Sequence, residues 1–207
     1  MIKKIYLTRH GETDYNKKGV VQGSGIDADL NDTGRAQAEA FYQAFKDHPF
    51  DKLYVSGLKR THQSMEKFIN SGMNHEILPD LNEISWGVHE GVPVDDAGQR
   101  YYLDMIRRWQ GGEVDIAIEG GESPIQVAER MQNALDYILS QSHEQEVLIC
   151  MHGRAMRVML AVMLNYPLKS MDVFEHKNLC LYQLAHTGSS FQLERYNDIT
   201  PLQGLAG

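Results

Sequence analysis

Short apolar runs alternate along the chain with longer segments in which apolar residues recur every three or four positions. The first pattern predicts strands that are buried on both faces, and the second predicts amphipathic helices. The predicted strands cover residues 4–8, 52–55, 76–78, 147–151, 179–184 and 191–196, and the last two form a closing pair around Thr187-Gly188-Ser189. The predicted helices cover about 34–46, 59–70, 95–109 and 154–164, and a further helix starts at Pro124.

Two of these helices begin with typical start signals. Asn31-Asp32-Thr33 precedes the first, and Ser123-Pro124 precedes the helix that carries Val127 and Met131 on its inner side. The alternation of strands and helices indicates an α/β fold with a mainly parallel sheet. Residues of about 84–121 are the least regular and are rich in glycine. We therefore expect a single domain, residues 1–207, with a small inserted cap at about 84–121.

Composition narrows the class of protein. The chain has 207 residues, of which 42% are hydrophobic and 23% charged, and its formal net charge is −8. An acidic chain gives no support to binding of nucleic acid or of an anionic membrane. The longest apolar run, 158–164, is far shorter than the ~18–20 residues of a membrane span. Met1-Ile2-Lys3-Lys4 leads at once into the first predicted strand, so we expect no apolar segment of a signal peptide.

Both cysteines, Cys150 and Cys180, lie in strand-like runs. We expect buried, reduced thiols of a cytoplasmic protein rather than a disulfide or a metal pair, and their spacing matches no zinc signature.

Histidine follows two of the predicted strands directly. Arg9-His10-Gly11 ends the first apolar run, and His152-Gly153 ends the run at 147–151. Ligands of an open α/β sheet bind at the carboxyl ends of its parallel strands. If these two strands are neighbours, both histidines and Arg9 meet in one crevice.

The other strand ends add to the same edge. Ser56 and Arg60 follow the second strand, and Glu83 follows the third. Arginine is well suited to bidentate binding of phosphate. Gly11 and Gly153 would let backbone amides approach an anion, and the helix after His152 would point its positive end at the pocket. The edge is therefore predicted to be an anion-handling site.

Five blocks along the chain resemble the motifs of the histidine phosphatase superfamily, also called the phosphoglycerate mutase-like family. These are Leu7-Thr8-Arg9-His10-Gly11-Glu12-Thr13 with Asn16, Ser56-Gly57-Leu58-Lys59-Arg60-Thr61, Leu81-Asn82-Glu83-Ile84-Ser85-Trp86-Gly87 with Glu90-Gly91, Gly120-Gly121-Glu122-Ser123, and Met151-His152-Gly153. They occur in the family's order and span about residues 4–185. The resemblance implies a three-layer sandwich, in which helices flank a mainly parallel central sheet, with a small cap.

The resemblance also implies roles for residues. His10 would be the nucleophile and become a phosphohistidine, while Arg9, Arg60 and His152 would hold the charge of the transferring phosphoryl group. Glu83 would protonate the leaving oxygen and then activate water, with Glu12 and Glu90 as competitors for that role. The implied substrate-binding residues are Asn16, Gln22, Gly23, Gly153 and Arg154. No metal or cofactor is expected, because the arginines replace it.

Some features depart from the family or lie outside its motifs. Arg154 stands where a small residue is common, and it would either extend the basic rim towards a second anionic group or pair with a carboxylate. In the cap, Arg107, Arg108 and Trp109 are candidates for contacting the leaving group, although adjacent arginines on a helix point in different directions. The remaining histidines are expected to be solvated or locally bonded: His48, His62, His75, His89, His143, His176 and His186.

Three functions are compatible with these residues. The favoured one is a metal-independent phosphomonoesterase acting on a small phosphorylated metabolite, because the segment between Glu83 and His152 is shorter than in the family's phosphoglycerate mutases. A phosphoglycerate mutase, primed by a bisphosphate, would share the His10 intermediate. A non-catalytic protein that binds phosphorylated ligands is the third, and the complete set of charged residues argues against it. The sequence leaves the substrate open and allows a monomer or a homodimer.

Overall fold

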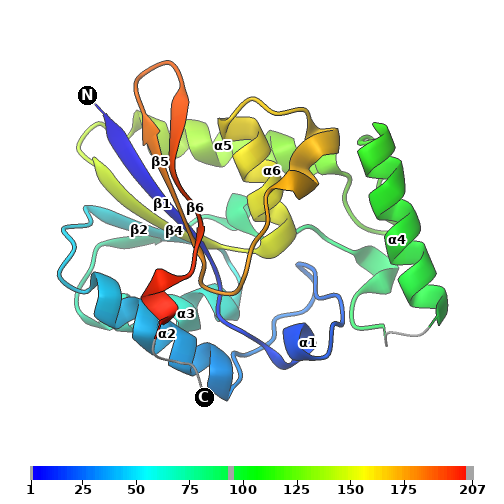
Figure 1. Cartoon of the computed structure of the whole chain (residues 1–207), viewed down its shortest axis with the longest axis horizontal. Coiled ribbons are helices and arrows are strands. Elements are labelled where there is room, and N and C mark those ends of the chain that lie inside the picture. Colours follow the sequence, from blue (N-terminus) through cyan, green and yellow to red (C-terminus); the bar gives the residue numbers. More distant parts are fainter. Residues whose placement is uncertain (1, 93–95, 204–207) are drawn as a thin grey trace.

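A six-stranded sheet forms the centre of the computed structural model, which describes residues 2–92 and 96–203 (Figure 1). Positions 1, 93–95 and 204–207 of the predicted domain, including part of the predicted cap, lie outside the described residues. The strands are β1 (Lys3–Arg9), β2 (Lys52–Val55), β3 (His75–Ile77), β4 (Glu146–Met151), β5 (Leu181–His186) and β6 (Phe191–Asp198). Their order is β3-β2-β4-β1-β5-β6. The pairs β3–β2, β2–β4 and β4–β1 are parallel, and β5 is antiparallel to both of its neighbours, β1 and β6. The predicted mainly parallel sheet is confirmed.

Helices cover both faces of this sheet. The α-helices are α1 (Asp14–Lys17), α2 (Asp32–Phe45), α3 (Lys59–Asn70), α4 (Asp96–Gly111), α5 (Pro124–Ser140) and α6 (Gly153–Met163). Short 3-10 helices are η1 (Pro79–Leu81), η2 (Gly87–His89), η3 (Leu168–Val173) and η4 (Thr200–Leu202). Figure 1 shows α2 and α3 on one face and α5 and α6 on the other, with α4 beyond the sheet. The predicted three-layer sandwich is confirmed.

The strand β1 illustrates why the central strands are apolar throughout. Successive side chains of a strand point to opposite faces. Ile5 and Leu7 belong to the core that α5 and α6 cover, whereas Tyr6 belongs to the core that α2 and α3 cover. Both faces of the strand are therefore buried, which is the arrangement that a continuous apolar run predicts.

The predicted helix starts are confirmed in detail. The Asn31 side chain accepts a hydrogen bond from the Gly34 amide (2.9 Å) and caps α2. Ser123 caps α5, and the Ser123 amide donates a hydrogen bond to Gln126 Oε1 (2.8 Å). The predicted start of the cap helix at residue 95 falls outside the described residues. Strand β5 begins later than predicted because Leu179 has a φ of 51°, a left-handed conformation that a strand does not accommodate.

The topology places the predicted site. Strands β1 and β4 are adjacent and parallel, and Arg9 is in register with Met151. His10 and His152, the residues that follow, therefore leave the sheet at the same level. None of the described helices is long and apolar enough to cross a membrane.

Candidate active site

His10 and His152 lie side by side beyond the ends of β1 and β4, as predicted. Their ring centroids are 5.2 Å apart, and the His10 amide donates to the Met151 carbonyl oxygen at 3.0 Å. This backbone hydrogen bond holds His10 and His152 next to each other just beyond the ends of the two strands.

The tautomer of His10 follows from its surroundings. Its Nδ1 lies 2.7 Å from the Gly11 carbonyl oxygen, which can only accept a hydrogen bond, so Nδ1 carries the proton and Nε2 keeps a lone pair. His10 is 2% exposed. Burial, reinforced by the positive charges of Arg60 and Arg9, lowers the pKa of His10 well below its usual value. The imidazole is therefore neutral at neutral pH.

Arg60 and His152 form a buried layer behind His10. Arg60 Nε donates to His152 Nδ1 at 3.1 Å, so His152 carries its proton on Nε2 and donates to Ser56 Oγ at 2.7 Å. Arg60 also donates to the carbonyl oxygens of Ile26 (2.7 Å) and Gly23 (3.1 Å). Burial lowers the pKa of Arg60 to about 10 and, with Arg60's charge, lowers the pKa of His152. Arg60 is a cation and His152 a neutral ring at neutral pH.

A cavity of about 210 Å³ opens in front of His10. Seven of the predicted site residues line it: Arg9, His10, Asn16, Gln22, Glu83, Gly153 and Arg154. Arg60, His152 and Gly23 are not among its lining residues. The carbonyl of Gly23 instead supports the Arg60 guanidinium from behind.

Two polar groups at this cavity have no hydrogen-bond partner among the residues that the structure describes. They are Arg9 Nε and Gln22 Oε1, and both atoms are buried. Rotation of the Gln22 amide by half a turn would let the Thr13 hydroxyl, now its 2.7 Å partner, donate to Oε1 and would present Nε2 to a ligand. Buried donors without partners are costly, and a bound oxyanion would satisfy them.

Glu83 lies at the amino end of α6. Its Oε1 accepts from the amides of Ile84 (3.0 Å) and Ala155 (2.8 Å), and its Oε2 accepts from the Arg154 amide (3.1 Å). We expected the positive end of this helix to face the anion directly, but the carboxylate takes two of its first N–H groups. Glu83 is held rigidly at the cavity wall, with Oε2 the less occupied oxygen.

The two competing carboxylates do not line this cavity. Glu90 accepts a hydrogen bond from the Trp86 amide (2.9 Å) and fills the space beside Gly23, where a Cβ atom would come within 2.0 Å of Glu90 Oε1. Glu12 accepts from Asn31 Nδ2 at 2.9 Å. Both carboxylates support loops around the cavity.

For Arg154 the sequence left open two places, at the rim of the anion site or in a pair with a carboxylate, and the structure shows it both at the cavity and paired. It lines the cavity, and it also donates to Asp172 and, at 3.2 Å, to the Tyr102 hydroxyl. Arg157 binds the same Asp172 oxygen at 2.5 Å. In α4, Arg107 is exposed and Arg108 pairs with Glu113 (2.9 Å), and neither arginine lines the cavity. Trp109 is buried and donates to the Ile116 carbonyl oxygen.

The prediction that His176 is solvated or locally bonded was wrong. His176 lines the cavity, and its Nδ1 lies 3.3 Å from Arg9 Nη1. Burial and the charges of Arg9, Arg157 and Arg154 lower its pKa to about 2. No strand or motif precedes His176 in the sequence, so the only signal was its presence among seven unassigned histidines.

The two glycines after the histidines serve packing. A Cβ atom on Gly153 would lie 2.7 Å from His176 Cε1 and 3.3 Å from Arg9 Nε. The expectation that Gly11 leaves its amide for an anion was wrong, since this amide donates to Ser64 Oγ at 2.8 Å. A Cβ atom on Gly11 would lie 2.7 Å from the Gly34 carbonyl oxygen.

Within residues 2–92 and 96–203, no group of three His, Cys, Asp or Glu side chains is arranged to hold a metal ion. Among the described residues that line the cavity, Arg9, Arg154 and Arg157 offer positive charge to a bound anion.

Comparisons with known proteins show what the sequence and the fold of this chain resemble. Phosphoserine phosphatase 1 of Hydrogenobacter thermophilus is 30% identical over 185 residues, which cover 88% of this chain and 86% of that protein. "Probable phosphoglycerate mutase GpmB" of Erwinia tasmaniensis is 28% identical and covers 98% of this chain and 96% of its own. The solved structure of Bacillus stearothermophilus YhfR superposes with a TM-score of 0.86 at 24% identity, covers 97% of this chain and 100% of that one, and supports the fold alone. The sequence profile named "Histidine phosphatase superfamily (branch 1)" matches residues 5–199, so the chain belongs to this superfamily.

Proposed function

We propose that the chain is a metal-independent phosphomonoesterase that acts through a phosphohistidine on His10. The observation that carries this proposal is the state of His10: a neutral imidazole whose free Nε2 adjoins an arginine-lined cavity. A neutral imidazole is a competent nucleophile near pH 7.

In the first step, Nε2 of His10 forms a bond to phosphorus while the bond from phosphorus to the leaving oxygen breaks. Nδ1 keeps its proton and its hydrogen bond to Gly11 throughout. Glu83 gives a proton to the leaving oxygen, so that the product departs as an alcohol. Arg9, with its unpartnered Nε, neutralises charge on the phosphoryl oxygens. Arg60, which is held by the neutral His152, adds positive potential from behind His10.

In the second step, a water molecule attacks the phosphohistidine. Its proton passes to Glu83, the nitrogen–phosphorus bond breaks, and His10 returns to its neutral state. Inorganic phosphate leaves, and Glu83 again carries the proton that the next turnover needs. The net reaction consumes one phosphomonoester and one water and yields one alcohol and one phosphate.

The decisive test is phosphate release from a panel of phosphomonoesters in the presence of a chelator. We expect turnover by the parent protein and its abolition in His10→Ala, with the exposed His75→Ala as the matched control that keeps activity. Activity that survives His10→Ala, or that the chelator removes, would overturn the proposal.

A labelling experiment tests the intermediate itself. Brief incubation with a labelled phosphomonoester, followed by a quench that avoids acid, should leave label on the protein. The label should be absent from His10→Ala and should accumulate in Glu83→Gln, because hydrolysis of the intermediate needs the carboxylate. Label on His10→Ala would contradict the assignment.

A phosphoglycerate mutase is the second candidate, because one relative bears that name over nearly the full length of both chains. Conversion of 3-phosphoglycerate to 2-phosphoglycerate without net phosphate release would identify it. A non-catalytic protein would bind phosphate without turnover and without label. We favour hydrolysis because the segment between Glu83 and His152 is shorter than in the family's phosphoglycerate mutases.

The proposal extends to the surroundings of the protein. We infer a small phosphorylated metabolite as substrate, a monomer or homodimer as the working form, and the cytoplasm as the location. The last point rests on the two thiols, which are free and buried; burial raises the pKa of Cys180 to about 11 and that of Cys150 further.

A further inference from the structure

A second, larger chamber of about 450 Å³ adjoins the cavity in front of His10. The two share six lining residues: Arg9, Asn16, Val20, Val21, Trp86 and Tyr102. The chamber is therefore the space that the leaving group of a bound phosphomonoester would enter.

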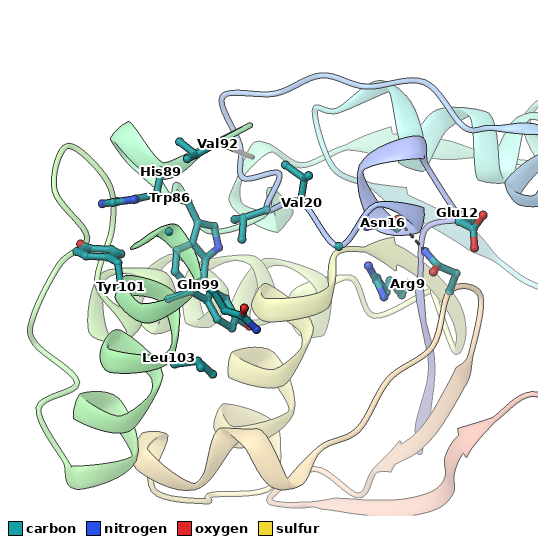
Figure 2. A pocket seen from close by; sticks show the side chains of 15 residues that line it. Arg9, Glu12, Asn16, Val20, Trp86, His89, Val92, Gln99, Tyr101 and Leu103 are labelled. Atoms are coloured by element: carbon teal, nitrogen blue, oxygen red, sulfur yellow. Dashed lines mark hydrogen bonds between the residues drawn. The ribbon is translucent and has the colours of Figure 1, made fainter. Parts of the chain in front are cut away.

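Aromatic rings form one end of this chamber. Figure 2 shows Trp86, His89 and Tyr101 at that end, with Val20 facing them and Arg9, Asn16 and Glu12 at the other end. Tyr101 stacks on His89 with ring centroids 3.6 Å apart and an interplanar angle of 15°.

The inner wall is built in the same way. Trp86 stacks on Tyr102 with ring centroids 5.0 Å apart and an angle of 30°. Trp109 packs against Trp86 with ring centroids 5.6 Å apart. Packed rings of this kind lose little conformational entropy when another ring joins the stack.

The charge of the chamber differs from that of the cavity. Among the described side chains that line it, Arg9 is the one arginine or lysine, and the proposed mechanism commits Arg9 to the phosphoryl group. Glu12 is held in place by its hydrogen bond from Asn31. A leaving group that carries a carboxylate or a second phosphate would therefore meet a fixed negative charge without a free cation to balance it.

We propose that the preferred substrates are phosphomonoesters whose leaving group is an uncharged alcohol bearing a planar aromatic ring. The ring lies between the valines of the 20–21 segment and the rings of Trp86, Tyr101 and Tyr102. This assignment rests on the proposed function, since it names the substrate class of the same site. It disfavours phosphoglycerates and sugar bisphosphates.

A panel of alkyl phosphates tests the assignment with little change in leaving-group chemistry. Benzyl phosphate supplies a planar ring, cyclohexylmethyl phosphate a ring of similar size that is not planar, n-propyl phosphate no ring, and 3-phosphoglycerate an added carboxylate. We expect kcat/KM for benzyl phosphate to exceed that for n-propyl phosphate by about 30-fold, on the basis of the apolar area that a phenyl ring buries. Cyclohexylmethyl phosphate should fall between them, and 3-phosphoglycerate should fall below n-propyl phosphate.

Two variants and one control variant sharpen the test. Tyr101→Ala should lower the ratio of kcat/KM for benzyl over n-propyl phosphate by about 5-fold through loss of ring contact. Tyr166→Ala, at an exposed tyrosine outside the chamber, should leave this ratio unchanged. Glu12→Gln keeps the oxygen that accepts from Asn31 and should raise the ratio for 3-phosphoglycerate over n-propyl phosphate by about 5-fold, because the repelling charge is gone.

The outcomes separate this assignment from the proposed function. Preference for 3-phosphoglycerate, equal rates for benzyl and n-propyl phosphate, or ratios that neither variant moves would overturn the aromatic assignment alone. Release that persists in His10→Ala, or no release from any of the four esters, would overturn the proposed function and the assignment with it.

Discussion

Arg130 of α5 donates a hydrogen bond to the carbonyl oxygen of Glu83 at 3.1 Å, and its other four N–H groups bind the residues just before Glu83 and the Glu122 carboxylate. Nη1 donates to the carbonyl oxygens of Asp80 and Asn82, each at 2.7 Å. Nε and Nη2 hold the Glu122 carboxylate at 2.8 and 2.9 Å. All five donors of the guanidinium are used. Arg130 is therefore a positioning residue for the segment that carries Glu83.

We expect Arg130→Lys to lower kcat by about 10- to 100-fold for an alkyl phosphate, with little change in KM. A lysine has three donors on one nitrogen and cannot span these partners, so Glu83 would lose its fixed place relative to the leaving oxygen. An aryl ester such as p-nitrophenyl phosphate needs little help from a general acid, because its leaving group is stable as an anion. The loss should therefore be smaller for the aryl ester.

The control for this variant is Arg108→Lys. Arg108 also binds a glutamate, Glu113, through Nε (3.1 Å) and Nη2 (2.9 Å), but at the exposed end of α4. It should leave both esters unaffected. Equal losses for the alkyl and the aryl ester in Arg130→Lys would show that Arg130 supports the fold without positioning Glu83.

Gly153 gives a second prediction, because His176 and Arg9 occupy the space where its side chain would be. Gly153→Ala places a Cβ atom 2.7 Å from His176 Cε1, and the imidazole must move. Arg9, which contacts His176 Nδ1, would shift with it. We expect kcat/KM to fall by about 10- to 100-fold, as for other misplacements of an active-site group by about an ångström.

A double variant identifies the cause of that loss. Removal of the imidazole in Gly153→Ala/His176→Ala makes room for the new methyl group, so the second substitution should recover part of the activity. Gly111→Ala is the matched control, since a Cβ atom there has no neighbour within 4 Å. Losses that simply add in the double variant would contradict the steric explanation.

The buried histidines predict how stability depends on pH. The pKa of His176 is lowered to about 2 by burial and the neighbouring arginines, whereas a histidine in the unfolded chain titrates near its usual pKa of 6.5. Below pH 6.5 the unfolded chain binds a proton that the folded protein does not bind. The contribution of His176 to stability is therefore fully present above this pH and is lost as the pH falls.

Each histidine of this kind should remove about 2 kcal/mol from the free energy of unfolding between pH 7 and pH 5. His10 and His152 add to the effect, because their pKa values are lowered as well. His176→Asn keeps an acceptor for Arg9 but cannot titrate. In urea unfolding at the two pH values, this variant should lose about 2 kcal/mol less than the parent. An equal loss in both proteins would contradict the lowered pKa of His176.

The sequence predicted the part of the site that lies at strand ends. His10 and His152 each follow a continuous apolar run directly, and the parallel pairing of β1 with β4 brings them together. Glu83 also lines the cavity, although η1 separates it from β3. Arg9, the last residue of β1, reaches the cavity directly. Local pattern was sufficient here because a strand fixes where its next residue lies.

The rest of the site depends on contacts between distant segments, which no local pattern reveals. Asp172 lies in η3, His176 lies in the loop that follows it, and Arg130 lies in the middle of α5. Arg157 lies one turn beyond Arg154 on α6, and both arginines pair with the Asp172 carboxylate. Helical spacing places the two arginines on one face, but it does not reveal the carboxylate that they share. The complete burial of Arg60 and His152 behind His10 likewise results from packing between distant segments, which the sequence pattern did not predict.

Asp172 balances the charge of the cavity. Its Oδ1 accepts from Arg154 and Arg157, and its Oδ2 accepts from Gln110 of α4 at 3.1 Å. Burial alone would raise the pKa of the Asp172 carboxyl, but the two arginines outweigh it and hold this pKa below its usual value. At neutral pH the carboxylate therefore weakens the positive potential that Arg154 and Arg157 present to an anion.

We expect Asp172→Asn to bind inorganic phosphate roughly 5-fold more tightly, because one compensating charge near the cavity is lost. The same change should lower the free energy of unfolding by about 3 kcal/mol, since two partly buried arginines lose their partner. Phosphate binding can be measured by calorimetry without a substrate, and urea unfolding gives the stability. Glu113→Gln removes an exposed partner of Arg108 far from the cavity and should change neither quantity. Weaker phosphate binding in a folded Asp172→Asn protein would mean that Asp172 acts mainly by orienting the two arginines, and the charge-balance explanation would then be wrong.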